Sequence, residues 1–161
     1  MNKKNPSAVT TDKRIRDAGK SKNESAELQE LRPGQSVELL KELHILTRDG
    51  RLNQDSRRKL KQVYHLFNFI EPLLTELSAQ GGGPTLADHG AGKSYLGFIL
   101  YDLYFKALGH GRIYGVETRA ELVEKSRVLA QRLHFERMSF LNLSVAESAD
   151  ARELPLSLIH I

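Results

Sequence analysis

The sequence of 161 residues contains no cysteine, and none of its apolar runs approaches the ~20 residues that a membrane-spanning helix needs. The lack of thiols excludes disulfide bonds, zinc–thiolate sites, iron–sulfur clusters and a cysteine nucleophile. The N-terminus does not have the pattern of a secretory signal. We therefore expect a cytoplasmic protein that does not enter the membrane.

Beyond residue 24 the chain carries no net charge. The first 24 residues hold seven Lys and Arg residues against three acidic ones, which accounts for the whole net charge of +4. Residues 1–34 are also poor in large apolar side chains, so they cannot bury enough surface to offset the entropy of ordering. We predict a disordered basic tail over 1–34, and such a tail can contact phosphate backbones.

A helical segment is predicted over residues 35–80. Ser36 has the position of an N-cap for a short helix that continues through Leu46 and stops at Asp49-Gly50. A longer helix is expected over 54–79, because its apolar residues recur at a spacing of 3.6.

Three features of the longer helix carry further expectations. Asp55 or Ser56 can cap it, and Pro72 should kink it or divide it. Its first turns hold four cations, which oppose the helix dipole and indicate either a polyanionic partner or a solvated face. These cations are Arg57, Arg58, Lys59 and Lys61.

After the linker Gly81-Gly82-Gly83-Pro84 the pattern alternates between strand and helix. Strands are predicted at 85–88, 112–117 and 138–143, separated by two helices. The first helix should follow Gly92, bury one face and end before Gly109, and the second should cover 120–133. The face expected to be buried in the first helix consists of Leu96, Ile99, Leu100, Leu103 and Ala107. A βαβαβ order implies a parallel sheet with right-handed crossovers, so the fold class is α/β.

The strongest chemical signal is the glycine-rich run from Asp88 to Ser94, between the first strand and its helix. A P-loop would need a glycine at position 87, which is alanine, and Asp88 would place negative charge near the phosphates. A dinucleotide fingerprint would need a third glycine where the chain has Tyr95, which is too bulky for close helix–strand packing.

A third interpretation is a site for S-adenosylmethionine. Gly90 and Gly92 let a ligand pass close to the main chain, and the amides that open the next helix can receive a carboxylate. Asp88 ends the first strand and can receive the ligand ammonium, directly or through water. Glu117 ends the second strand, where acids bind ribose hydroxyls in related nucleotide folds.

Two stretches resemble the class I S-adenosylmethionine-dependent methyltransferases, namely LADHGAGKSYL from Leu86 and IYGVE from Ile113. The resemblance covers residues 36–150 and implies the first half of a Rossmann-like parallel sheet over 84–155. It also implies a set of cofactor contacts, with the adenine beside the last two of them. This set is Asp88, Gly90, Ala91, Gly92, Glu117, Ser144 and Val145.

The chain departs from the family pattern at three points. Ser94 replaces a third glycine, Lys93 is unusual beside a sulfonium, and Leu143-Ser144 lacks the usual acid. The substrate-side motif expected after a fourth strand is absent, so no catalytic residue is assigned. The histidines do not occur at metal-ligand spacing, and no metal is expected.

The methyl acceptor predicted from charge alone is RNA, because of the basic tail and the cations at 57–61. Two other functions remain open at this point. One is a P-loop-type nucleotide hydrolase. The other is a non-enzymatic basic RNA-binding or scaffold protein.

The last six residues, LSLIHI at 156–161, match the translation of a transposon-derived sequencing adapter. We therefore predict a non-native tail there and a truncated sheet. An outer edge of the first strand would then be open, so we expect marginal stability and no transferase activity from the chain alone. The alternative is a genuine fourth strand that begins after Pro155.

Overall fold

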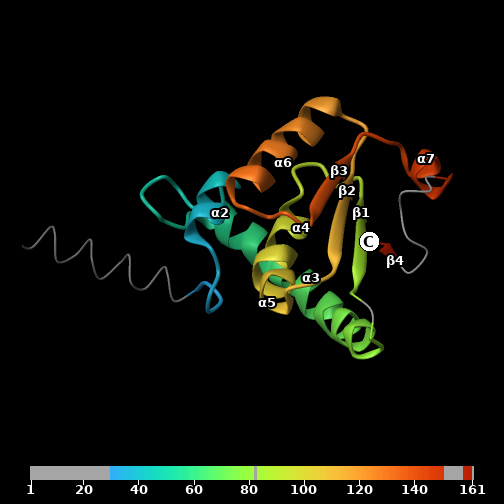
Figure 1. The fold of residues 1–161 in the computed structure, drawn as a ribbon. Coiled ribbons are helices and arrows are strands. Elements are labelled where there is room, and N and C mark those ends of the chain that lie inside the picture. The colour runs from blue at the N-terminus through green and yellow to red at the C-terminus, as the bar shows by residue number, and fades with distance from the viewer. Residues whose placement is uncertain (1–29, 82, 151–157, 161) are drawn as a thin grey trace, which may run out of the picture.

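The computed structural model describes residues 30–81, 83–150 and 158–160. They form an open sheet with helices packed against it (Figure 1). Most of the predicted tail over 1–34, and residues 151–157 near the end of the chain, lie outside the described residues. In the described ranges, no helix combines the length and the apolar character needed to cross a membrane.

Helix α2 spans Val37–Glu42, and its first turn is capped by the hydroxyl of Ser36, as predicted. The helix is shorter than expected and does not reach Leu46. The reason is His44, whose φ of 55° is a left-handed backbone conformation through which a right-handed helix cannot continue.

Helix α3 spans Gln54–Ala79, the range predicted from the apolar spacing. Its N-cap is Asn53, whose side chain accepts a hydrogen bond from the Ser56 amide at 2.8 Å, so the predicted caps are wrong by two or three residues. Pro72 does not divide the helix. Proline has no amide hydrogen, so Pro72 leaves the Asn68 carbonyl without its helical partner. Both residues are exposed, and water can donate to that carbonyl instead.

Strands β1 (Thr85–His89), β2 (Arg112–Val116) and β3 (Met138–Leu141) run parallel in the order β3-β2-β1. Their carboxyl ends therefore meet at one edge of the sheet, which points upward in Figure 1. The predicted βαβαβ order and α/β fold class are confirmed.

The connection between β1 and β2 contains one continuous helical stretch, Tyr95–Leu108, which changes its winding. It begins as α4 (Tyr95–Leu100), continues as one π-helical segment (Tyr101–Phe105) and ends as α5 (Lys106–Leu108). A π turn holds more residues than an α turn, so it rotates the residues that follow relative to the core.

The rotation corrects the predicted buried face of this connection. Leu103 is only half-buried and Ala107 is exposed, although both were expected inside. Tyr101, Asp102 and Phe105 are buried instead. The buried Asp102 side chain accepts a hydrogen bond from the Ser36 amide at 2.7 Å. This bond joins the π-helical segment to the start of α2.

Helix α6 (Ala120–Arg132) connects β2 to β3, and α7 (Val145–Asp150) follows β3. Residues Leu158–His160 form strand β4, which pairs in parallel with β1 through Thr85, Leu86 and Ala87. The expectation of an open edge on β1 is thus corrected, because main-chain pairing by β4 covers that edge. This strand lies within the segment 156–161 that the sequence predicts to be a non-native tail.

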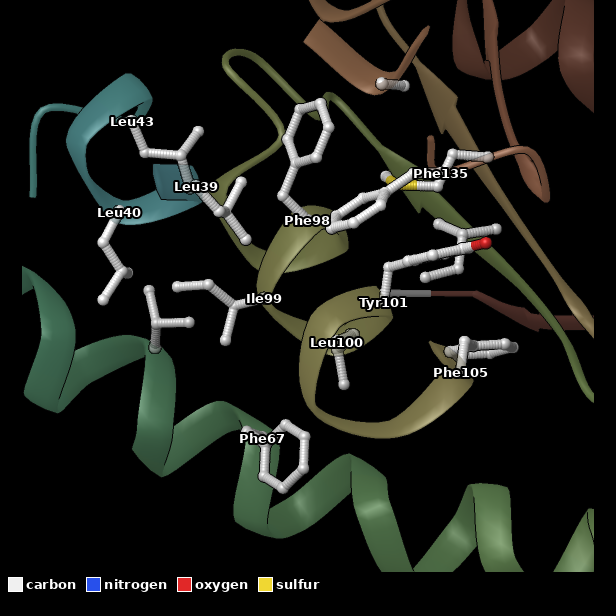
Figure 2. Packing of buried hydrophobic residues seen from close by; sticks show 14 of the residues in the cluster. Leu39, Leu40, Leu43, Phe67, Phe98, Ile99, Leu100, Tyr101, Phe105 and Phe135 are labelled. Atoms are coloured by element: carbon white, nitrogen blue, oxygen red, sulfur yellow. The ribbon is translucent and has the colours of Figure 1, made fainter. Parts of the chain in front are cut away.

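The core is one continuous apolar cluster that includes the leading helices. Figure 2 shows α4 and the π-helical segment lying between leucines of α2 and Phe67 of α3 on one side and Phe135 on the other. Phe98 is fully buried, and its ring centroid lies 5.7 Å from that of Phe140 on β3 and 6.2 Å from that of Phe135. Packing on both sides fixes the helix that begins directly after the glycine-rich run.

Candidate functional site

The glycine turn, residues 90–94, connects β1 to α4 at the carboxyl edge of the sheet. Gly90 and Gly92 have φ values of 67° and 59°, a left-handed conformation that favours residues without a Cβ. A Cβ at Gly90 would meet no atom within 4 Å, so the main chain there is open to a ligand. The Ala91 amide donates to the Val116 carbonyl at 3.1 Å, which draws the turn over the end of β2.

Asp88 is a buried carboxylate at the end of β1, with 9% of its surface exposed. Burial raises its pKa to about 6. Within the described ranges, no group donates a hydrogen bond to its side chain or forms an ion pair with it. A buried carboxylate without a partner, beside an open main-chain turn, has the character of a site for a ligand cation.

Glu117 follows β2 and has the opposite electrostatic environment. Its carboxylate accepts the Gly92 amide at 2.8 Å and the Arg119 amide at 3.1 Å. The Arg119 guanidinium adds two bonds of 3.0 Å, one to each oxygen. These bonds, first among them those of the Arg119 side chain, lower the pKa of Glu117 to about 2. Gly92 and Glu117, two of the predicted contacts, are thus in direct contact.

Ser144 and Val145 lie after β3, at the beginning of α7. The Ser144 amide donates to the Glu147 carboxylate at 2.7 Å, and the Glu147 amide donates to the Ser144 hydroxyl at 3.2 Å. This reciprocal pair is a capping box, so both polar groups of Ser144 serve the helix start. Val145 is 61% exposed.

Three contacts near the strand ends were not predicted from the sequence. The Asn142 side chain donates to the Glu117 and Thr118 carbonyls at 3.0 and 2.8 Å, and the Ser148 hydroxyl lies 3.3 Å from His89 Nδ1. The third is the pairing of Arg119 with Glu117. An opposite charge two residues away was the only sequence signal for that pair. A spacing of two puts side chains on one face of a strand, but Glu117 and Arg119 follow β2, so the strand period does not apply to them.

The geometry of Ser94 argues against a P-loop. In that motif the Ser or Thr hydroxyl faces a phosphate-bound magnesium ion. The Ser94 side chain is instead buried, with 2% exposed, and its oxygen would lie 3.2 Å from a Cβ at Gly115 in the sheet. Position 87, where the motif requires its first glycine, is a fully buried alanine within β1.

Metal ligands do not gather near the turn. Over the part of the chain that the structure describes, no group of three His, Asp or Glu side chains is placed to hold a metal ion.

A family model described as a methyltransferase domain matches this chain over residues 58–160. None of the curated proteins matches the chain significantly. The matched range contains all of the predicted contact residues.

Several solved structures are similar to part of this chain. The C-terminal domain of precorrin-6Y C5,15-methyltransferase from Rhodobacter capsulatus is 22% identical, with a TM-score of 0.37 over 47% of this chain and 37% of that one. An rRNA methylase from Streptococcus thermophilus is 12% identical, with a TM-score of 0.38 over 48% of this chain and 41% of that one. The bifunctional kinase-methyltransferase WbdD is 21% identical, with a TM-score of 0.47 over 80% of this chain and 25% of that one. The chain thus spans less than half the length of each of these proteins.

Proposed function

Since the chain belongs to the methyltransferase-domain family of class I S-adenosylmethionine-dependent enzymes, we propose that it binds S-adenosylmethionine at the glycine turn and supports methyl transfer to RNA. The family implies S-adenosylmethionine as the methyl donor. When bound, this group supplies an electrophilic methyl on a sulfonium, which an N, O or C nucleophile of the acceptor attacks in line. Such a transfer depends on alignment more than on acid–base help.

The observation that carries the proposal is the carboxylate of Asp88, which has no partner among the described residues and lies beside the open main chain of Gly90. The ammonium of the ligand would supply the cation that Asp88 lacks among the described residues. The ligand carboxylate would be received by turn amides other than those of Ala91, Gly92 and Ser94, which already donate within the protein. Glu117 would accept the ribose hydroxyls. Ser144 and Val145 would flank the adenine, and Ala91 and Gly92 would line the turn beneath the ligand.

Calorimetry with S-adenosylhomocysteine, the product of the reaction, tests this assignment. We expect binding by the parent and a loss of at least tenfold in affinity for Asp88→Asn, because the variant keeps the shape of the side chain but not its charge. Asp102→Asn is the matched control, since Asp102 is also a buried aspartate with a raised pKa but lies away from the turn. Absence of binding by the parent would contradict the proposal.

RNA as the acceptor is supported by the first turns of α3. Arg58, Lys59 and Lys61 are exposed there, and Phe69 on the same helix is 65% exposed. Exposed cations and aromatic rings are the two elements with which proteins hold single-stranded nucleic acids. The basic tail would add further cations.

Fluorescence anisotropy with a single-stranded RNA tests the acceptor class. The double variant Lys59→Glu and Lys61→Glu should bind more weakly and show a shallower salt dependence, because fewer counterions are released. Lys125→Glu, a charge reversal at an exposed position of α6, is the control. RNA binding without any binding of S-adenosylhomocysteine would favour the non-enzymatic RNA-binding or scaffold function instead. Binding of magnesium–ATP would favour the nucleotide hydrolase.

A further inference from the structure

The guanidinium of Arg119 covers the carboxylate proposed to receive the ribose. Its Nε and Nη2 atoms each lie 3.0 Å from one oxygen of Glu117. The Nη2 atom would also lie 3.7 Å from a Cβ at Gly92, so the guanidinium extends over the glycine turn itself. Arg119 thus occupies the space between the two strand ends where the proposed ligand would lie.

The hydrogen bonds to Glu117 leave no room for a ribose. An ionised carboxylate has about four lone-pair sites. Besides the two bonds from the guanidinium, the carboxylate accepts the Gly92 and Arg119 amides and a longer contact of 3.3 Å from the Thr118 hydroxyl. Its acceptor sites are therefore fully used in this structure.

We propose that Arg119 is a positioning residue that acts as a latch on Glu117 and releases it when the ribose hydroxyls bind. This inference rests on the proposed function, because it assumes that Glu117 receives the ribose. Removing the two guanidinium bonds frees about two of the carboxylate's sites, which equals the number of donors on a ribose diol. The two main-chain amides would continue to orient the carboxylate.

The guanidinium is the donor that can leave. The Gly92 amide is part of the main chain of the glycine turn, and the Arg119 amide is part of the main chain before α6, so neither can move away alone. The Arg119 side chain is 58% exposed, and water can solvate it once it leaves Glu117. The charge of Glu121, in the first turn of α6, also acts on Arg119 and offers a second carboxylate to the released cation.

The ribose hydroxyls and the Arg119 guanidinium compete for the same acceptor sites of Glu117. Removing the guanidinium should therefore tighten the binding of a ligand that contains the ribose. The variant Arg119→Met keeps an aliphatic side chain but removes the guanidinium. We expect it to lower the Kd for S-adenosylhomocysteine by about threefold to tenfold. The 2′,3′-dideoxy analogue of S-adenosylhomocysteine has no hydroxyls to displace the latch. For that analogue the variant should bind as the parent does.

Two further variants separate the latch from a general charge effect. Arg119→Lys keeps the charge without the bidentate geometry and should fall between the parent and Arg119→Met. Lys125→Met removes an exposed cation from α6 and should leave both Kd values unchanged. In the free protein, a carbon-detected NMR titration of Glu117 should show its pKa move upward in Arg119→Met, since the Arg119 side chain is the largest cause of the low value.

The outcomes separate this inference from the proposed function. Binding of S-adenosylhomocysteine by the parent, with an equal or weaker affinity in Arg119→Met, overturns the latch and leaves the proposed function standing. An equal gain for the dideoxy analogue, or a Glu117 pKa that does not move, also overturns the latch. A parent that does not bind S-adenosylhomocysteine overturns both.

Discussion

Asp88 and Glu117 are two buried acids at the ends of neighbouring parallel strands, yet their pKa values shift in opposite directions. Desolvation raises that of Asp88 to about 6, whereas donors from Arg119 and Gly92 lower that of Glu117 to about 2. Two carboxylates in such different environments are suited to different tasks. Glu117 is already satisfied in the free protein, and Asp88 is the group that a cationic ligand would stabilise.

Replacement of Asp88 by asparagine should stabilise the free protein at pH 7. A carboxyl whose pKa is raised on folding favours the folded state below its ordinary pKa of 3.8, and this advantage disappears as the pH rises to about 6. Above that pH the charged form costs about 2 to 3 kcal/mol, part of which Asp88→Asn should recover. Urea unfolding of the parent and the variant at pH 4.5 and 7.5 measures the effect. A variant that is no more stable than the parent at pH 7.5 would contradict it.

Ligand affinity should follow the same titration. Because the carboxylate form of Asp88 would hold the ammonium, the affinity of the parent for S-adenosylhomocysteine should rise between pH 5 and 7, around the pKa of about 6. In Asp88→Asn the affinity should stay nearly constant over that range. Calorimetry at several pH values distinguishes the two cases, and parallel profiles would show that another group titrates.

At the scale of elements, α3 has a buried face and an exposed apolar stripe. Phe67 is 1% exposed and packs against the helix that follows the glycine turn, whereas Phe69, two residues later, is 65% exposed. Two phenylalanines of one helix therefore have different roles. Phe67 belongs to the core and Phe69 to the surface proposed for RNA.

This difference predicts distinct costs for two identical substitutions. Phe67→Ala should destabilise the protein by about 3 to 5 kcal/mol, through lost burial and the cavity that remains. Phe69→Ala should change stability by no more than about 0.5 kcal/mol but should weaken RNA binding. Thermal unfolding and anisotropy measure both variants. Similar losses of stability would mean that Phe69 is also packed.

At the scale of the whole molecule, the edge of β1 depends on the end of the chain. Strand β4 is only three residues long, Leu158–His160, and pairs with β1 in parallel. It supplies main-chain hydrogen bonds to an edge that would otherwise offer unpaired amides and carbonyls to another chain. The pairing of β4 with β1 is a property of this chain, whether or not the natural gene encodes residues 156–161.

A chain that ends at residue 157 should therefore expose the edge of β1. We expect faster hydrogen exchange in β1 and more aggregation on heating than for the full chain, measured by mass spectrometry and light scattering. Equal exchange in the two chains would show that β4 does not protect the edge. Our prediction that 156–161 are non-native is tested separately by resequencing the gene, in which a continuous frame with the same codons would disprove it.

Local patterns in the sequence predicted the elements well. The 3.6-residue spacing of apolar side chains located α3, and the run from Asp88 to Ser94 marked the turn between β1 and α4. Both signals are local: burial of one face sets the period of a helix, and left-handed backbone at Gly90 and Gly92 favours glycine. The parallel order of β1 to β3 followed from alternation of strands and helices, since crossovers are right-handed.

Other features arose only from tertiary structure. The π-helical segment turned Asp102 inward to meet Ser36, 66 residues earlier in the chain, and no local period contains that contact. The pairing of β4 with β1 likewise joins distant segments. Local sequence was enough to identify the acids at the strand ends, Asp88 and Glu117. Which of the two acids is paired depended on the folded chain. The approach of β1, β2 and the glycine turn brings the Gly92 amide and the Arg119 guanidinium onto the Glu117 carboxylate. The same arrangement leaves Asp88 without a donor from any residue that the structure describes.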